Sequence, residues 1–313
     1  MRTIVGVAGL ALTLAMVAGG CGDDASAGDT SGDSAVGDTT VADSAVADAA
    51  VADSAVGDTS GDVAVGSCEA PRPDSPAVSA AIGAVQATLV DPDGAPLTAV
   101  PVSVCGTDLC LTGVTDAGGH ASIAMNKTLV RPAFTAGDGR TVPKLLWPLT
   151  AASADVGTLV AARLPSAGAT LAPGGTAASG GVTLELAADA EVIVDSLSYP
   201  LPEDQALRAV ALPVAQSSAL VASTSGIGII YGMGPTGTLV CPPAALSVPN
   251  SAGWAAGSEV EVLLLGADVG EDWAPYGAWS KVADAVVSAD GAPVATPAGG
   301  GLPIIGTIAL RPR

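Results

Sequence analysis

The sequence predicts an all-β fold, with two β-sandwich domains that follow a cleaved signal peptide and a disordered acidic tether. Short segments in which apolar and polar residues alternate recur at residues 86–90, 99–104, 182–186 and 259–264. Alternation with a period of two is typical of half-buried strands, and turn sequences such as DPDG at residues 91–94 separate these segments. No long stretch combines a helical apolar period with helix caps, so no long helix is expected.

Residues 1–20 have the layout of a secretory signal peptide. Arg2 precedes a run of apolar and small residues that ends at Gly19 and Gly20. A positive start, an apolar middle and small residues at the end are the three parts of an export signal. The alternative is a transmembrane anchor, but a spanning helix needs about 20 apolar residues and usually a charged flank on its far side. The shorter run favours a cleaved segment.

Cys21 indicates a lipid anchor. Residues 18–21 (AGGC) resemble the lipobox of bacterial lipoproteins, although Ala18 stands where that pattern commonly has Leu. The resemblance implies that Cys21 is lipidated, becomes the mature N-terminus and attaches the protein to the membrane, because each buried methylene contributes about 0.8 kcal/mol. By the sorting rule of enteric bacterial lipoproteins, Gly22 does not signal retention in the inner membrane, so the resemblance implies the outer membrane of a bacterial cell envelope, with the body periplasmic or surface-exposed. The alternative is a soluble secreted protein whose cysteine falls there by chance.

Residues 21–67 are expected to form a disordered tether rich in Asp, Ala and Val. Aspartate recurs at every fifth position from Asp33 to Asp58, a period that matches neither a helix nor a strand. Residues 23–62 hold ten aspartates and no Lys, Arg or Glu, so charge repulsion favours an extended segment. A pentapeptide β-helix would need bulky inward residues where this repeat has Ala and Ser. Tight calcium sites need oxygens gathered by a folded loop, so calcium binding is not expected either.

The formal net charge of −20 limits the partners and cofactors. Nucleic-acid binding demands basic patches, so a nucleic-acid partner is not expected. His120 is the only histidine, and the spacing of the cysteines fits no zinc pattern. No metal site and no cofactor are predicted.

Four cysteines follow Cys21, and an even number in an exported chain suggests disulfides with three possible pairings. Cys105 and Cys110 would lie near the base of a β-hairpin, so a bridge between them is favoured. Cys68 would then pair with Cys241 and link the start of the first domain to the second domain.

Residues 68–165 form the first predicted domain. Its motif combines LVDPDGAPL at residues 89–97, VPVSV at residues 100–104 and GVTDAGG at residues 113–119. The motif is similar to that of carboxypeptidase regulatory-like domains, which are small transthyretin-type β-sandwiches. It departs from that family at residues 120–121, where HA replaces the usual aromatic position. The family is non-catalytic, so the resemblance implies a supporting or binding role.

Residues 166–313 form the second predicted domain. Its clearest stretch is YGMGPTGTLVCPPAALSVPN at residues 231–250. This stretch resembles the β-sandwich interaction domain shared by ankyrins, netrin receptors and zonula occludens proteins, with Val240 in place of an aromatic residue. The matching residues are Gly234, Pro235 and Gly237 in a turn, and Pro243, Leu246 and Pro249 in the strand that follows. The His-Phe-Ser sequence at which some members cleave themselves is absent from this chain, so that activity is not carried over.

No catalytic residues are predicted, and the chain is not expected to be an enzyme. Ser-His-Asp catalysis would have to use His120, which lies where a turn enters a strand, and the sequence has no GxSxG motif. Glu271 and Asp272, beside Trp273, are the most suggestive pair of carboxylates. Neighbouring residues on a strand point to opposite faces, which spoils the geometry that a glycosidase needs. The glycine-rich residues 226–234 precede a proline and a second strand, so they do not form a nucleotide-binding loop.

The aromatic residues Trp273, Tyr276 and Trp279 are the best candidates for binding. They fall within seven residues of a chain that has only four Trp, three Tyr and one Phe. Exposed rings could stack on sugars or anchor a protein partner, whereas the alternative is that they fill the sandwich core. The sequence therefore predicts a non-catalytic binding or structural lipoprotein with an unknown protein or polysaccharide partner. A carbohydrate-binding surface module is the first alternative, and a carboxylate-dependent hydrolase is a remote one.

Replacing Cys21 tests the anchor. We expect Cys21→Ser to abolish incorporation of an alkynyl fatty acid supplied to the cells, because the lipidated sulfur is removed. In-gel fluorescence of the labelled protein measures the effect. Unchanged labelling of the variant would contradict the anchor.

Overall fold

The computed structural model describes residues 68–73, 77–268 and 272–313, so Cys21, the predicted signal peptide and the predicted tether lie outside the described residues. The described residues all belong to one compact unit, Thr59–Arg313. They contain 18 β-strands and two short 3-10 helices, η1 (Pro202–Gln205) and η2 (Val214–Gln216). The predicted all-β fold is confirmed. No helix in this part of the chain is long and apolar enough to span a membrane.

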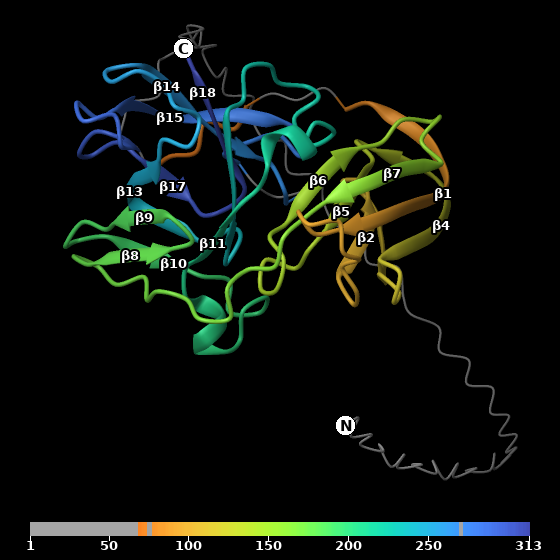
Figure 1. Ribbon diagram of the computed structural model, residues 1–313. Helices are drawn as coiled ribbons and strands as arrows, with labels where there is room; N and C mark the ends of the chain where they lie inside the picture. Colours follow the sequence, from red (N-terminus) through yellow and green to blue (C-terminus); the bar gives the residue numbers. More distant parts are fainter. Residues whose placement is uncertain (1–67, 74–76, 269–271) are drawn as a thin grey trace, which may run out of the picture. The chain divides into compact units, whose positions relative to one another are not determined.

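The first seven strands form two sheets that share one core (Figure 1). These two sheets are called here the first sandwich. One sheet has the order β4-β1-β7, and the other has the order β3-β2-β5-β6. Strand β1 is antiparallel to β4 and parallel to β7. Leu89, Val104 and Phe134 lie in the core between the sheets. The bounds are β1 (Ser79–Val90), β2 (Pro101–Cys105), β3 (Cys110–Val114), β4 (His120–Val130), β5 (Ala133–Ala136), β6 (Leu145–Pro148) and β7 (Asp155–Val160).

The predicted turn at residues 91–94 ends β1. The Asp91 carboxylate accepts hydrogen bonds from the backbone N–H of Asp93 at 2.9 Å and of Ala95 at 2.8 Å. Gly94 has a φ of 83°, a left-handed conformation that favours glycine. The chain therefore reverses where the sequence indicates.

The later strands form an 11-stranded sheet, called here the larger sheet system, in which β13 pairs with four other strands. Residues 239–244 of β13 pair with β10 and β17, whereas residues 245–249 pair with β9 and β16. One long strand thus carries two sets of neighbours. The bounds are β8 (Thr176–Ser179), β9 (Val182–Glu185), β10 (Glu191–Ile193), β11 (Arg208–Ala211), β12 (Ile229–Gly234), β13 (Leu239–Pro249), β14 (Glu259–Leu265), β15 (Trp279–Val287), β16 (Pro293–Ala295), β17 (Leu302–Ile304) and β18 (Ile308–Pro312).

Strand β12 and the second half of β14 are buried on both faces. Ile230, Leu263 and Leu265 belong to the core that they share with the first sandwich. Met233 and Leu264 belong to a second core within the larger sheet system. Successive residues of a strand point to opposite faces, so this part of the sheet is a layer between two cores.

The loop between β5 and β6, residues 137–144, joins the first sandwich to the larger sheet system. Three backbone carbonyls of this loop accept hydrogen bonds from side chains of the later strands and loops. The pairs are Asp138 with the Tyr199 hydroxyl at 3.4 Å, Arg140 with the Arg208 guanidinium at 2.7 Å, and Lys144 with the Thr307 hydroxyl at 2.8 Å. A Cβ on Gly234 would lie 2.0 Å from the carbonyl oxygen of Gly139, so the close approach of the two backbones requires glycine there.

Tyr199 is the largest side chain that is fully buried at this junction. Its hydroxyl oxygen accepts a hydrogen bond from the backbone N–H of Thr236 at 2.9 Å. Burial raises the pKa of Tyr199 to about 12, because the phenolate would lose its hydration, and the hydrogen bond from Thr236 opposes this only in part.

Replacing Tyr199 with phenylalanine tests this junction. We expect Tyr199→Phe to lower the free energy of unfolding at pH 7 by about 1–3 kcal/mol, because the Thr236 N–H loses its acceptor. The pKa of Tyr199 is higher in the folded protein than the value of about 10 for an unfolded chain, so its contribution is complete below pH 10 and falls as the pH rises toward 12. The difference between the two proteins should therefore narrow above pH 10. Urea unfolding at pH 7, 10 and 11 measures it, and a difference that stays constant would contradict the assignment.

Candidate functional site

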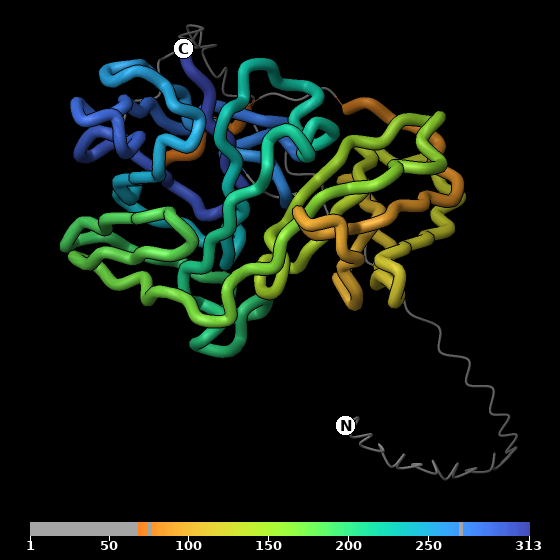
Figure 2. Tube along the Cα trace, in the orientation of Figure 1, coloured from red at the N-terminus to blue at the C-terminus, as the bar shows by residue number. Residues whose placement is uncertain are grey.

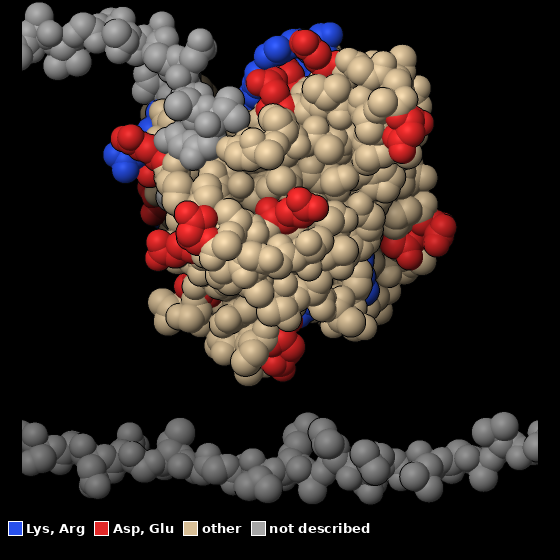
Figure 3. Space-filling view, turned by 90° about the vertical axis from the view of Figure 1, so that its left-hand side faces the viewer, with Lys and Arg blue, Asp and Glu red and all other residues tan. Residues whose placement is uncertain are grey.

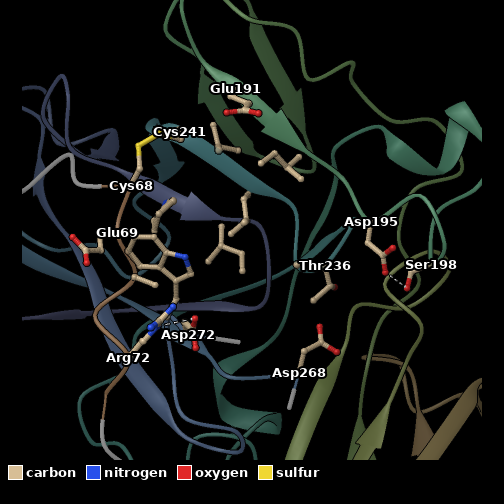
Figure 4. Close-up of a pocket in the computed structure, with 18 of the residues that line it drawn as sticks. Cys68, Glu69, Arg72, Glu191, Asp195, Ser198, Thr236, Cys241, Asp268 and Asp272 are labelled. Carbon is tan, nitrogen blue, oxygen red and sulfur yellow. Dashed lines mark hydrogen bonds and ion pairs between the residues drawn. A yellow bond between two sulfur atoms is a disulfide. The ribbon is translucent and has the colours of Figure 1, made fainter. Parts of the chain in front are cut away.

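A cavity of about 710 Å³ lies among β10, β13, β17 and the chain that precedes β1 (Figure 4). Residues from the β12–β13 turn and from the loop after β14 complete its wall. Lys144, at the end of the β5–β6 loop, also lines it. Small-molecule sites commonly have volumes of about 300–1,000 Å³, so this cavity is large enough for a small organic ligand.

Residues 68–72, called here the N-terminal strap, form one wall of this cavity. A disulfide joins Cys68 to Cys241 on β13, with the two Cα atoms 5.4 Å apart. Arg72 donates its backbone N–H to the carbonyl oxygen of Asp272 at 2.9 Å and its Nε–H to the carboxylate at 3.1 Å. Figure 2 shows the strap lying among the C-terminal strands, away from β1. A disulfide, a backbone hydrogen bond and an ion pair therefore hold this wall in place.

Apolar side chains form the floor of the cavity. Val240 on β13 and Ile304 on β17 are buried, and the indole of Trp273 is only 7% exposed. Ile193 and Leu239, which are partners across β10 and β13, are more exposed and also line the cavity. These five side chains offer an apolar surface to a ligand.

Five carboxylates and two cationic side chains surround this apolar floor, so the lining carries three more negative than positive charges. The carboxylates are those of Glu69, Glu191, Asp195, Asp268 and Asp272. Arg72 pairs with Asp272, and Lys144 Nζ lies 2.5 Å from Asp268 Oδ1. In Figure 4 the labelled carboxylates stand around the cavity and do not converge on one point. Within the described ranges, no group of three or more His, Cys, Asp or Glu side chains could hold a metal ion.

This concentration of carboxylates is local. Only 13% of the chain is charged, and the face drawn in Figure 3 has separated acidic side chains on a largely uncharged surface. Seven of the 19 residues that line the cavity are charged, a larger share than in the whole chain.

Asp195 carries a negative charge at neutral pH. The Ser198 hydroxyl donates to its carboxylate at 2.6 Å, and the backbone N–H of Leu197 donates at 3.0 Å. These bonds, and more weakly the charge of Lys144, hold the pKa of Asp195 below its usual value. Glu191 lies exposed on β10, and its carboxylate has no hydrogen-bond or ion-pair partner among the described residues. Both carboxylates are available to a ligand.

The three aromatic residues that the sequence singles out do not form one exposed surface. Trp273 belongs to the second core and reaches the cavity. Tyr276 is 8% exposed and packs in the core of the first sandwich, where Thr135 hydrogen-bonds its hydroxyl and burial raises its pKa. Trp279 is half-buried and donates its indole N–H to the carbonyl of Leu220 at 3.2 Å. The three rings therefore do not form one exposed surface, because Trp273 packs in the second core whereas Tyr276 and Trp279 pack in and against the core of the first sandwich.

His120 and Asp272, the described candidates for catalysis, each contact a neighbouring polar side chain. His120 is exposed at the start of β4, and its Nδ1 lies 2.9 Å from the hydroxyl of Thr88. The Asp116 carboxylate accepts the backbone N–H groups of Gly118 and His120, and these bonds hold the pKa of Asp116 below its usual value. Asp272 pairs with Arg72, and Glu271 lies outside the described residues.

Both expected disulfides are present. Cys105 and Cys110 are directly opposite each other on β2 and β3, and Cys68 is bonded to Cys241. The hairpin bridge closes a short loop, with its cysteines 5 residues apart, whereas 173 residues separate the other two.

Comparison of the chain with protein-family models, with curated proteins and with solved structures finds no match in any of the three. The resemblances of residues 68–165 and 166–313 to known domain families therefore stay predictions.

No motif in the sequence indicates this cavity. Glu191 and Asp195 are four residues apart, but Asp268 lies more than 70 residues further along the chain, and the three belong to no recognisable motif. The one available signal was the favoured pairing of Cys68 with Cys241, which places the strap against β13. That pairing says nothing of the strands that bring the carboxylates together.

Removing each disulfide tests how the strap is held. We expect Cys68→Ala/Cys241→Ala to lower the free energy of unfolding by about 5 kcal/mol, because the chain-entropy model relates the loss to the length of the closed loop. Cys105→Ala/Cys110→Ala is the matched control and should cost about 2 kcal/mol in the same model. Guanidinium unfolding measures both values. Equal losses in the two variants would contradict this explanation.

Proposed function

We propose that this chain is a lipid-anchored, non-catalytic binding protein of the bacterial cell envelope, held at the outer membrane through Cys21, and that the cavity beside the N-terminal strap is its ligand site. The observation that carries the proposal is the cavity of about 710 Å³, which combines an apolar floor with charged groups at its edge. Small-molecule sites have this combination of apolar surface and a few polar groups that fix orientation.

The disulfides support an exported protein. Disulfides form and persist in oxidising compartments, such as the bacterial periplasm and the cell surface. Both bridges of this chain lie in the folded body, and one of them fixes a wall of the cavity. A wall fixed before a ligand arrives lowers the entropic cost of binding.

Blocking the cavity tests this function. Ser198 lines the cavity, whereas its neighbour Ser196 is exposed and does not. We expect a tryptophan at position 198 to fill the space near Asp195 and abolish binding, because the ring would occupy the volume of a ligand. Ser196→Trp is the matched control and should bind as the unchanged protein does.

The full chain, purified in detergent, would be tested against a panel of small organic cations, anions, neutral polyols and saccharides by saturation-transfer NMR. The proposal requires at least one compound whose signal is lost in Ser198→Trp and kept in Ser196→Trp. If no compound in the panel gives that result, the cavity is not the ligand site of this protein.

A further inference from the structure

We infer that the cavity binds linear aliphatic amines that carry more than one positive charge; this inference rests on the proposed function of the cavity as a ligand site. The apolar floor of the cavity and the distribution of carboxylates around its wall point to such a ligand.

The charge of the lining selects a cation. Asp272 pairs with Arg72, and Asp268 pairs with Lys144. Glu191 and Asp195 have no cationic side chain within ion-pair distance in the described part of the chain. The excess negative charge of the lining would repel an anionic ligand, and a neutral ligand would leave that charge without a counter-charge. A ligand with ammonium groups supplies the missing positive charges and forms charge-assisted hydrogen bonds, which are stronger than neutral ones.

The arrangement of the carboxylates selects a ligand with separated charges. Glu191 lies opposite Cys241 in the strand register, whereas Asp195 lies in the loop beyond β10. Figure 4 shows Glu191, Asp195 and Asp268 at different sides of the cavity. One compact cation cannot contact all of these groups, whereas a chain with an ammonium group at each end can contact two of them.

The floor selects an aliphatic chain between the charges. Val240, Ile304, Leu239 and Trp273 present apolar surface between the carboxylates. Burying methylene groups against such a surface is favourable, because about 25 cal/mol is gained for each Å² of apolar area removed from water. A polyol of the same length would bury hydroxyl groups there instead, and an unpaired buried hydroxyl is unfavourable.

The chain's own acidic segment does not complement this cavity. Residues 23–62 hold ten aspartates and no basic residue. This segment therefore has no positive charge with which to complement the lining. The complementary occupant is therefore a separate molecule with positive charge.

Three probes of equal chain length test the inference at pH 7: 1,6-diaminohexane, 1,6-hexanediol and adipate. Isothermal titration calorimetry with the full chain in detergent should show saturable binding of the diamine at least tenfold tighter than of the diol, and no binding of adipate. Raising the salt concentration should weaken binding of the diamine, because ions screen the charges near the surface. Trilysine, tested beside the diamine, identifies the source of the ammonium groups: tighter binding of trilysine indicates lysine side chains of a peptide, and tighter binding of the diamine indicates a free polyamine.

Single substitutions assign the carboxylates. Glu191→Gln and Asp195→Asn should each weaken binding of the diamine about tenfold, since each removes one charge and keeps the shape of the side chain. Glu185→Gln is the matched control, because Glu185 is exposed on β9 and does not line the cavity. Circular dichroism checks that each variant is folded.

Three results would overturn the inference. The first is binding of the diol as tight as that of the diamine. The second is an unchanged affinity for the diamine in both Glu191→Gln and Asp195→Asn, and the third is no binding of the diamine. If the panel of compounds described above still yields a ligand that is sensitive to Ser198→Trp, only the class of ligand is wrong. If the panel yields none, the proposed function is wrong as well.

Discussion

The packing of the β5–β6 loop against β12 is the contact on which the rest of the body depends. The glycine at position 234 lets the two backbones approach, and Tyr199, Arg208 and Thr307 hydrogen-bond the carbonyls of the loop. Buried backbone carbonyls need such partners, because an unpaired group would cost free energy. These bonds allow one face of the larger sheet system to pack on the first sandwich. Two sets of strands thus become one compact unit.

The cavity is a consequence of this junction. Lys144 ends the loop that makes the junction, and its ammonium group reaches Asp268 beyond β14. The strap, the β10 loop and β17 approach from other directions, because β13 carries two sets of neighbouring strands. The strands that hold the lining residues are fixed by the same backbone hydrogen bonds that hold the cores. The part of the lining that lies on strands is therefore fixed by the fold, whereas the strap is held by its disulfide and by Asp272.

The sequence predicted the all-β class, the turn at residues 91–94 and the favoured disulfides, because each depends on residues that are close together or on chemistry that cysteine alone supplies. It did not predict that β12 and β14 lie between two cores. The three consecutive leucines Leu263–Leu265 break the alternation of apolar and polar residues, which indicates burial on both faces. The sequence does not indicate which other strands cover the second face.

The spacing of Trp273, Tyr276 and Trp279 suggests one group of rings. Their rings diverge because the segment crosses from one core to the other.

The bond between Cys68 and Cys241 also determines how the body would respond to mechanical load. A pull on the chain before Cys68 would pass through the sulfur atoms directly into β13, and the residues between Cys68 and β1 would carry no tension. Strand β13 is held along its length by β9, β10, β16 and β17, all antiparallel to it, so several rows of hydrogen bonds would share the force. The rest of the strap would bear none of the pulling force, so the wall that it forms would keep its geometry. In this load path the disulfide and the strands beside β13 would bear the force, and the cavity next to them would keep its shape.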